Sequence, residues 1–559
     1  MVAARVLLLL CGLATQARAA RNTIIYPDEK PISVPLMKEQ NIAFGMPETL
    51  DLVSDRVVSL KPEQVHLTYW GSPSKMLVSF ASGDGRVTMG PPPAPGPPGS
   101  VAVAQWGQAP GKLSGNASCD TVTYVQNQFA WEQFPGYVSP RLSHCLMTGL
   151  PPGSRVFYRV GWPEYDQWSA VMNFTTTRAT ANFPFSLGVM ADLGTSFNAS
   201  QTVRQMARLA PSMVLNVGDL AYADTYLPDG RQGIVRKYYY SINYQPRWDM
   251  YGRMLQGLAS HIPVLPTPGN HDMEFQPDGT VFAAYTSRYP VPQAPAGTKP
   301  GDAPLRVEVN RFTAANPSPD RGLFYSVDIP GTAHISTVTS YITNDTFQPD
   351  TDQYKWFEAD LAGVDRKKTP WLIVMFHAPV ISSYEDAFKQ VECMRLTYEP
   401  LLYKYGVDIV YNGHVHAYER SKPQYNYTLD PCGTIHITAG CGGKAGIPVT
   451  GEYALDRGFI DDQPQPEYCA DPEILSNKIN PTQPGPRCFT RQKALGGYCW
   501  DRQPDFSAYR QPAYGHGLLN LINATHAEWN WYLNADHGER VVDRVVINRA
   551  LPKRCRTRR

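Results

Sequence analysis

The sequence has almost no net charge and, after its first residues, no long hydrophobic run. Its 51 lysine and arginine residues balance 50 aspartate and glutamate residues to a net charge of +1, so the charge predicts no attraction to nucleic acid or to an anionic membrane. No segment downstream of the N-terminus is apolar enough to form a membrane-spanning helix. The cysteines include no CxxC pair, which argues against a zinc ribbon. We therefore expect a soluble protein with no membrane span and no nucleic-acid partner.

The N-terminus has the three parts of a secretory signal peptide. MVAAR carries one positive charge, VLLLLCGLAT is apolar but too short to span a bilayer, and QARAA offers a small-x-small cleavage site at Ala17 to Ala19. We predict that residues 1–19 are removed and that the protein is secreted or extracellular, with a vacuole or lysosome-like compartment as the alternative. Six Asn-x-Ser/Thr sequons agree with this route and predict a glycoprotein: Asn116, Asn173, Asn198, Asn344, Asn426 and Asn523.

The cysteines are expected to form disulfides in that oxidising compartment. Cys11 leaves with the signal peptide, so nine of the ten cysteines remain, and the odd number leaves at least one thiol free or bonded to another chain. The sequence does not fix the connectivity. The candidate pairs are Cys119 with Cys145, Cys432 with Cys441, and pairs among Cys469, Cys488 and Cys499.

Short apolar or alternating bursts indicate an all-β region before residue 177. QVHLTYW, KMLVSFA and SRVFYRVG each have the length of a strand, and the turn signal LPPGS precedes the third. We predict a β-sandwich domain over residues 40–177, interrupted at residues 90–100 by a proline- and glycine-rich surface insertion.

After TTTRATANF, apolar bursts alternate with helical segments. FSLGVM, MVLNV, IPVLP, WLIVMF and VDIVY have strand length, and ASQTVRQMARLAP, DQYKWFEADLAGVDRKK and ECMRLTYEPLLYKYG have helical character. This alternation predicts an α/β layer fold over residues 183–549. A Pro-, Gly- and Cys-rich stretch at about residues 465–502 is expected to be an inserted loop, and residues 550–559 form a basic tail.

Polar residues follow directly after each of the five strand-like bursts. Binding sites in open α/β sheets form at the carboxyl ends of the strands, so these side chains are placed to converge. Taken singly, each has an ordinary explanation, because an aspartate can cap a turn and a histidine can be hydrogen-bonded in a core. Together they form a set of metal-ligand types, and alternate residues of GHVH share one face of an extended segment. The set is Asp192 in ADLG, Asp219 and Tyr222 in GDLAY, Asn270 in GNHD, His377 in VMFH, and His414 and His416 in GHVH.

In this order, the motifs ADLG, GDLAY, GNHD, VMFH and GHVH resemble the five-block pattern of the purple acid phosphatases, within the metallophosphoesterase superfamily. The resemblance spans residues 183–549 and includes YADTY, TPWLIVMFHAP and NGHVHAYERS. The β-rich N-terminal region and FSAYRQPAYGHGLLNL resemble the large plant-type members. The resemblance implies a fibronectin type III-like sandwich followed by a metallophosphoesterase catalytic domain, an α/β sandwich.

The same resemblance implies two metal ions. The first would be held by Asp192, Asp219, Tyr222 and His416, and the second by Asp219, Asn270, His377 and His414, with Asp219 bridging. Two carboxylates and a phenolate make the first set rich in hard anionic donors, which suits Fe(III). The second set shares one carboxylate and is otherwise neutral, which suits a divalent Zn, Mn or Fe ion.

The implied function is that of a secreted acid phosphatase, a phosphoric monoester hydrolase that uses hydroxide activated by two metals. His271, next to Asn270, is the candidate to contact the substrate or protonate the leaving oxygen, unless it only orients Asn270. We expect an acidic pH optimum and small phosphorylated substrates, and a homodimer stays open. The alternatives are a phosphodiesterase, pyrophosphatase or phytase on the same scaffold, and a non-catalytic extracellular binding glycoprotein.

The chain departs from the family pattern at three places. Ala191 stands where glycine is usual, which we expect to matter little, and Asp272 replaces a glutamate, which could move a hydrogen bond to a metal ligand. The loop after His377, APVISSYEDAFKQVE, lacks the histidines with which plant-type members line the substrate pocket. The residues that could take over part of that role are Tyr384, Glu385, Asp386 and Lys389. Leaving-group chemistry and substrate preference depend on this loop.

Overall fold

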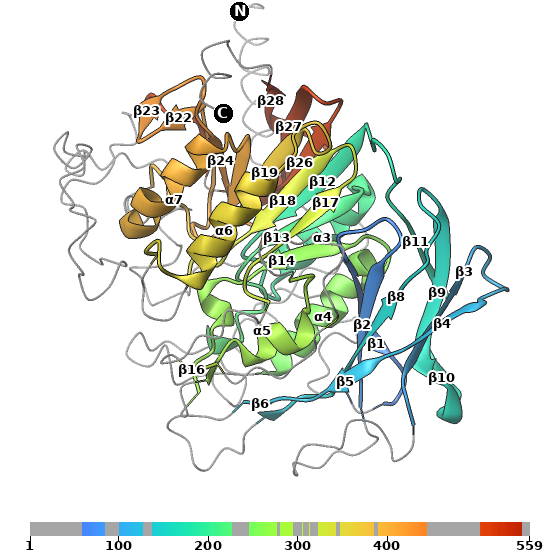
Figure 1. Ribbon diagram of the computed structural model, residues 1–559. Helices are drawn as coiled ribbons and strands as arrows, with labels where there is room; N and C mark the ends of the chain where they lie inside the picture. The colour runs from blue at the N-terminus through green and yellow to red at the C-terminus, as the bar shows by residue number, and fades with distance from the viewer. Residues whose placement is uncertain are drawn as a thin grey trace, which may run out of the picture.

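The computed structural model describes most of the chain between residues 57 and 549 (Figure 1). The described ranges are 57, 59–83, 100–126, 137–225, 245–276, 280–293, 305, 312–313, 322–341, 347–384, 390–443, 504–511 and 513–549. The predicted signal peptide, nearly all of the proline-rich insertion, the cysteine-rich insertion and the basic tail lie outside these ranges, as do Asn344, Glu385, Asp386 and Lys389.

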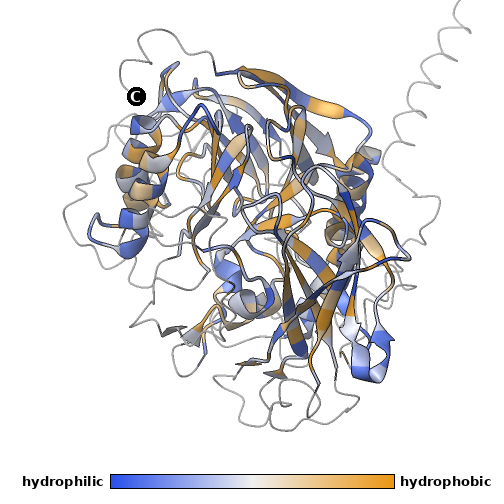
Figure 2. Cartoon of the chain, turned by 45° about the vertical axis from the view of Figure 1, so that its right-hand side comes forward, coloured by the Kyte–Doolittle hydropathy of each residue, from blue (hydrophilic) through white to orange (hydrophobic). Residues whose placement is uncertain are grey.

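The N-terminal part forms a β-sandwich of two antiparallel sheets, drawn in blue to cyan in Figure 1. The first sheet has the order β1 (Glu63–Tyr69), β2 (Met76–Ser82), β8 (Arg141–Met147) and β5 (Asp120–Val122). The second has the order β10 (Gln167–Trp168), β9 (Arg155–Trp162), β3 (Val103–Gly107) and β4 (Gly115–Ser118), with β11 (Met172–Thr175) also paired to β9. Figure 2 shows hydrophobic and hydrophilic residues mixed along the strands. Burial alternates along the first part of β9, as expected where one face of a sheet is buried, whereas β2 is buried along its whole length.

Two mixed sheets form the centre of the catalytic part. The first has the order β14 (Val264–Thr267), β13 (Met213–Val217), β12 (Phe185–Met190), β26 (Gly515–Leu521), β27 (His526–Leu533) and β28 (Val541–Asn548). The second has the order β17 (Tyr325–Ile329), β18 (Ala333–Thr337), β19 (Trp371–Met375), β20 (Ile409–Asn412), β24 (Ile435–Ala439), β21 (Tyr418–Ser421) and β25 (Ser507–Gln511). The strands that precede the site motifs are parallel within each sheet, so their carboxyl ends lie at one edge.

Each central strand has two buried faces, which explains its continuous apolar sequence. In β19, Trp371, Ile373 and Met375 belong to the core between the two sheets, whereas Leu372 and Val374 belong to the core beneath the helices. The helices are α3 (Phe197–Leu209), α4 (Pro246–Ala259), α5 (Ala283–Arg288), α6 (Asp352–Gly363) and α7 (Glu392–Lys404). Figure 1 shows α6 and α7 beside the seven-stranded sheet and α3 to α5 on the other side. The catalytic part is therefore an α/β sandwich that follows a β-rich domain, as the sequence predicted.

The remaining short elements are two-stranded pairs and 3-10 turns. They are β6 (Val125–Gln126) with β7 (Tyr137–Val138), β15 (Thr280–Val281) with β16 (Phe312–Thr313), β22 (Gln424–Tyr425) with β23 (Thr428–Leu429), and the turns η3 (Pro163–Tyr165), η4 (Ala223–Thr225), η6 (Asn270–Asp272) and η10 (Asn534–Asp536). Among the described helices, none has the length and hydropathy needed to cross a membrane.

The cysteines follow the prediction at one pair and depart from it at another. Cys119 and Cys145 form a disulfide inside the sandwich. The predicted pair of Cys432 with Cys441 is wrong, because Cys441 is a buried thiol and Cys432 is disulfide-bonded elsewhere. Cys441 follows β24 and lies against the turn after β12, where Gly442 N–H donates to the Ala191 carbonyl, so the fold holds it in the core. Cys469, Cys488 and Cys499 lie outside the described residues.

Candidate dinuclear metal centre

The site residues leave the ends of their strands through tight turns of the backbone. Four of them have a left-handed backbone, with φ of 52° at Asp192, 53° at Asp219, 54° at Tyr222 and 69° at His414. Residues other than glycine seldom adopt this conformation, and its strain is typical of functional sites. The strand ends thus direct these side chains to one place at the expense of local backbone stability.

Two glycines of the motifs leave space for the carboxylates. A Cβ atom on Gly269 would lie 2.0 Å from Oδ1 of Asp219, and one on Gly413 would lie 2.4 Å from Oδ2 of Asp192. Neither carboxylate can move away, because both are buried. The glycines in GNHD and GHVH are therefore required by close approach of the backbone to the site.

Asp192, Tyr222 and His416 form one cluster, which we call the first half-site. The Tyr222 hydroxyl lies 3.0 Å from Oδ1 of Asp192 and 2.8 Å from Nε2 of His416. Nε2 of His416 lies 3.3 Å from the same Asp192 oxygen. Asp192 and Tyr222 are fully buried, so two oxygen donors and an imidazole face one another away from bulk water.

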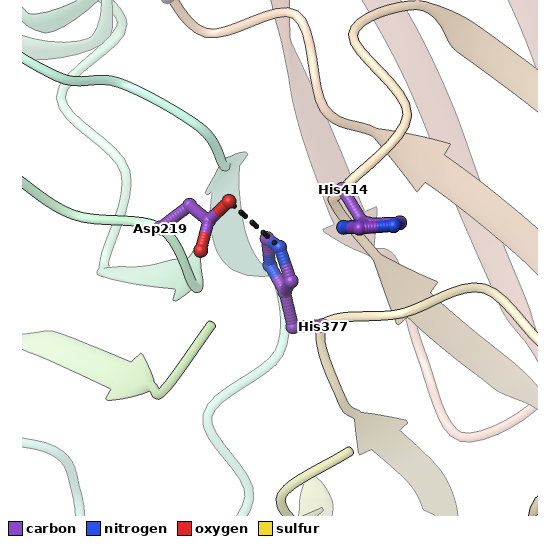
Figure 3. A group of neighbouring side chains, drawn as sticks. All are labelled: Asp219, His377 and His414. Carbon is purple, nitrogen blue, oxygen red and sulfur yellow. Dashed lines mark ion pairs between the residues drawn. The ribbon is translucent and has the colours of Figure 1, made fainter. Parts of the chain in front are cut away.

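Asn270, His377 and His414 form the second half-site, with Asp219 between the two. Oδ1 of Asn270 lies 2.9 Å from Nδ1 of His414, and Oδ2 of Asp219 lies 3.1 Å from Nε2 of His377. Figure 3 shows the His377 ring between Asp219 and His414. Ligand atoms of these three residues all lie within 4.8 Å of one another, which is close enough to surround a single ion.

The hydrogen bonds of the two histidines test whether this half-site suits a cation. Nδ1 of His377 lies 2.8 Å from the Val217 carbonyl, and Nε2 of His414 lies 3.0 Å from Oε1 of Gln390. Each of these nitrogens must donate a proton, so in the neutral ring the other nitrogen carries a lone pair. That lone pair faces an oxygen acceptor of Asp219 or Asn270. Acceptors that face acceptors repel unless a positive charge lies between them, so the donor set fits a bound metal ion.

The pKa shifts of His377 and Asp219 also indicate that the second half-site favours a positive charge. Burial would lower the pKa of His377, but Asp219 and Asp192 raise it to about 9. Burial would raise the pKa of Asp219, but the positive charges of His377 and His271 hold it below its usual range. Without a metal, a proton on His377 compensates the carboxylates, and a bound cation would displace that proton.

Asp272, the departure in the third motif, supports the turn that carries Asp219. Its carboxylate accepts hydrogen bonds from the backbone N–H groups of Asp219, Leu220 and Gly269 at 3.0, 3.0 and 2.8 Å. The N–H of His271 in turn donates to Oδ1 of Asp219 at 2.8 Å. The shorter aspartate is therefore accommodated as a backbone anchor within the third motif.

His271 forms a pair with an aspartate that the sequence analysis did not single out. Nδ1 of His271 lies 2.7 Å from Oδ2 of Asp224, and the His271 ring lies over the Tyr222 ring with centroids 4.4 Å apart. The signal was present, because Asp224 stands two residues after Tyr222 in GDLAYAD. The carboxylate orients the imidazole and compensates its charge when it is protonated.

Tyr341 and Gln390 support the second half-site and were also missed. The Tyr341 hydroxyl donates to Oδ1 of Asn270 at 3.1 Å, and Gln390 contacts Nε2 of His414. Tyr341 stands at a sixth strand exit, after β18, so the same pattern could have found it; the position of Gln390 gives no such signal. Tyr384, considered for the pocket, instead donates its hydroxyl to the Tyr418 carbonyl at 3.2 Å.

Comparisons with known proteins agree with this architecture. Residues 185–418 match the calcineurin-like phosphoesterase family, residues 62–176 the purple acid phosphatase N-terminal domain, and residues 492–544 the iron/zinc purple acid phosphatase-like C-terminal family. Purple acid phosphatase 15 of Arabidopsis thaliana is 33% identical over 98% of this chain and 97% of the relative. Purple acid phosphatase 13 of the same plant is 31% identical over 94% of this chain and 93% of the relative.

A solved structure shares the fold at low sequence identity. The purple acid phosphatase PPD1 isolated from yellow lupin (Lupinus luteus) seeds superimposes with a TM-score of 0.59 and 18% identity, covering 87% of this chain and 74% of that one. The family assignment rests on the relatives that match nearly the full chain, and the lupin structure supports the fold alone. The chain belongs to the purple acid phosphatase family of metallophosphoesterases.

Proposed function

We propose that this protein is a secreted acid phosphatase that hydrolyses phosphate monoesters at a dinuclear metal centre. The observation that carries the proposal is the second half-site, where Nε2 of His377 lies 3.1 Å from Oδ2 of Asp219 and Nδ1 of His414 lies 2.9 Å from Oδ1 of Asn270. In the absence of a metal, a proton on His377 would face Asp219, and a bound cation would take the place of that proton. Asp219 lies between the half-sites and is the candidate bridging ligand.

The residues proposed to hold the two ions differ in charge. Asp192, Tyr222 and His416 would hold Fe(III) together with Asp219, and Asn270, His377 and His414 would hold a divalent Zn, Mn or Fe ion. Such a pair supplies hydroxide at low pH and neutralises the charge of the phosphoryl group. An acidic pH optimum follows from this chemistry.

His271 is proposed as the residue that contacts the substrate and protonates the leaving oxygen. Its Nδ1 lies 2.7 Å from Oδ2 of Asp224, which orients the ring for proton transfer. Its side chain is 17% exposed, unlike the buried carboxylates of the half-sites, which allows a substrate to reach it. The proton acquired by the leaving group would come from Nε2 of this ring.

A substrate panel and a metal analysis test the proposal. The panel compares a phosphate monoester, a nucleotide sugar, a phosphodiester and phytate at acidic pH, and we expect the monoester to be hydrolysed with the highest kcat/KM. A preference for the diester, the pyrophosphate bond or phytate would favour the alternative on the same scaffold. Carefully purified protein with neither iron nor a second metal would contradict an enzymatic role and favour an extracellular binding glycoprotein.

Secretion and glycosylation are part of the same proposal. Asn116 and Asn523 are exposed in the folded chain, where an attached glycan would meet no packed core. N-terminal sequencing should find the mature chain beginning after residue 19, and glycosidase treatment should lower the apparent mass. The oligomeric state, for which a homodimer stays open, is tested by the molecular mass of the purified protein in solution.

A further inference from the structure

Two buried glutamines join the N-terminal sandwich to the segment that follows the candidate catalytic histidine. Nε2 of Gln126, in β6, donates to the Glu274 carbonyl at 3.1 Å, and Nε2 of Gln276 donates to the Val125 carbonyl at 3.2 Å. Each side chain thus reaches across the domain boundary to a backbone carbonyl of the opposite segment. Gln126 is 0% and Gln276 is 3% exposed, so water cannot readily replace either bond.

A second set of contacts ties the same segment to the sandwich through α4. The Tyr124 hydroxyl of the sandwich donates to Oε1 of Gln245 at 2.6 Å, and the Gln245 side chain also hydrogen-bonds the Glu274 carboxylate. The other end of that carboxylate is fixed by Trp248, whose Nε1 donates to Oε1 of Glu274 at 2.9 Å. Both the backbone and the side chain of Glu274 are therefore held by residues at the domain boundary.

The boundary is stiffened by a buried arginine. The Arg288 guanidinium contacts Tyr124 Oη, Tyr137 Oη and Gln64 Oε1, all from the sandwich, at 3.1, 3.0 and 3.1 Å. It also pairs with Asp249 of α4 at 3.0 Å. A planar guanidinium that is saturated in this way fixes the angle between the two domains more tightly than apolar contacts would.

The held segment is short and rigidly linked to the site. His271 lies in the turn η6 (Asn270–Asp272), only three residues before Glu274, and Glu274 has a left-handed backbone with φ of 45°. Such a strained residue persists only where its surroundings impose it. The surroundings here are Gln126, Gln245 and Trp248, so the sandwich contributes to the conformation that follows His271.

We propose that the N-terminal sandwich is a positioning element of the active site, and that the reciprocal pair of Gln126 and Gln276 holds His271 in place for proton transfer. The inference rests on the proposed function, in which His271 protonates the leaving oxygen. Gln126 and Gln276 are positioning residues, because they act through the backbone of residues 271–276 and do not touch the substrate. The domain boundary would then serve catalysis as well as stability.

The test compares substrates that differ in their need for a proton. Gln126→Met and Gln276→Met remove one hydrogen bond each at nearly constant side-chain volume, and the metal-loaded full-length protein is used throughout. We expect kcat for an alkyl phosphate to fall about tenfold, since small displacements of a catalytic group are costly. We expect kcat for 4-nitrophenyl phosphate, whose leaving group needs little protonation, to change less than about threefold. Metal content and visible spectrum should stay unchanged.

Gln256 offers a matched control in the same boundary. Its Oε1 accepts a hydrogen bond from the backbone N–H of Val65 at 3.0 Å, so Gln256→Met also removes a glutamine-to-backbone bond between the domains. It should lower the unfolding temperature without changing the ratio of kcat for the two substrates. Gln276→Met probes the same contact from the other side if Gln126→Met does not fold, and the double variant should be no worse than the more affected single one.

The outcomes separate this inference from the function on which it rests. A selective loss with the alkyl phosphate in both glutamine variants, but not in Gln256→Met, supports the positioning role. Equal behaviour of all three variants, while His271→Asn still loses alkyl phosphate selectively, overturns the positioning role alone. A His271→Asn variant that loses no activity overturns the assigned role of His271 and this inference with it.

Discussion

The two half-sites differ in the charge of their donors and in how those donors are held. In the first, Asp192 and Tyr222 present oxygen atoms that contact each other directly and are closed off from water. In the second, two imidazole rings and an amide are each held by a further residue, as Gln390 holds His414 and Tyr341 holds Asn270. On the proposed assignment, the first half-site would bind a highly charged ion tightly, and the second would bind a less charged ion that exchanges more easily.

The comparison also shows where the substrate can reach the centre. Asn270 and His414 are only partly buried, whereas Asp192 and Asp219 are fully enclosed. His271 stands beside Asn270 and lies over the Tyr222 ring, so it can serve a phosphate group that spans both half-sites. On the proposed function, the first half-site would retain its metal, and the more exposed second half-site would admit the substrate.

The largest expected effect comes from removing the charge that the two half-sites share. Asp219→Asn should lower kcat about 1000-fold or more, because several kcal/mol of charge stabilisation are lost together with metal bridging. Steady-state kinetics and metal content of the purified variant measure this. Asp365→Asn, at an exposed position that pairs with Lys368, is the control and should match the wild type. Near-normal turnover of Asp219→Asn would refute the proposed bridging ligand.

In the metal-free protein, His377 should carry the proton that a bound metal ion would displace, and this proton should stabilise the fold. The folded-state pKa of His377, about 9, lies above its ordinary value of 6.5, so its stabilisation is fully present below pH 6.5 and is lost as the pH rises through 9. Metal-free His377→Gln should be less stable than metal-free wild type by about 3 kcal/mol at pH 6, with the difference vanishing by pH 10. Denaturant unfolding at both pH values checks this. A difference independent of pH would show that the half-site does not bind this proton.

The proton donor should be separable from the metal ligands. His271→Asn should lower kcat for an alkyl phosphate about 100-fold while both metals are retained, because general acid catalysis is lost but no ligand is. Kinetics and metal analysis are made on the same preparation. Loss of the second metal from this variant would instead show that His271 serves to orient Asn270.

A smaller effect is expected from the residue that holds His414. Gln390→Met should speed the release of the divalent ion to a chelator by about tenfold to 100-fold, because a ligand that loses its outer hydrogen bond binds metal less well. Gln390→Glu should slow the release, since a carboxylate makes the imidazole a stronger donor. Iron should stay bound in both variants. Equal release rates in the wild type, Gln390→Met and Gln390→Glu would show that Gln390 does not affect metal binding.

Much of the fold and of the candidate site follows from local sequence. The predicted strand FSLGVM coincides with β12, and MVLNV coincides with β13. These predictions were possible because a strand that is buried on both faces has a continuous apolar sequence. The polar residues that directly follow the strands could be recognised as one cluster, because parallel strands have their carboxyl ends at the same edge of a sheet. After the end of α7, Gly406 has a φ of 62°, the left-handed conformation with which a glycine commonly ends a helix.

What the sequence could not show depends on contacts between distant segments. The partner of Asp224 is His271, 47 positions away, and that of Gln126 is Glu274, 148 positions away. The pairing of Cys432 with Cys441 looked reasonable from their separation, but β24 carries Cys441 into the core, away from Cys432. Neither spacing nor periodicity encodes such contacts, because they arise only when the domains and sheets pack.

The visible absorption spectrum of the metal-loaded protein, recorded beside that of Tyr222→Phe, tests the asymmetry of the half-sites most directly. A phenolate bound to Fe(III) gives a charge-transfer band, so the wild type should be coloured. Tyr222→Phe should keep its fold and lose that band. A wild-type protein that carries two metals per chain and shows no such band would contradict an iron–tyrosinate site and favour a pair of Zn or Mn ions.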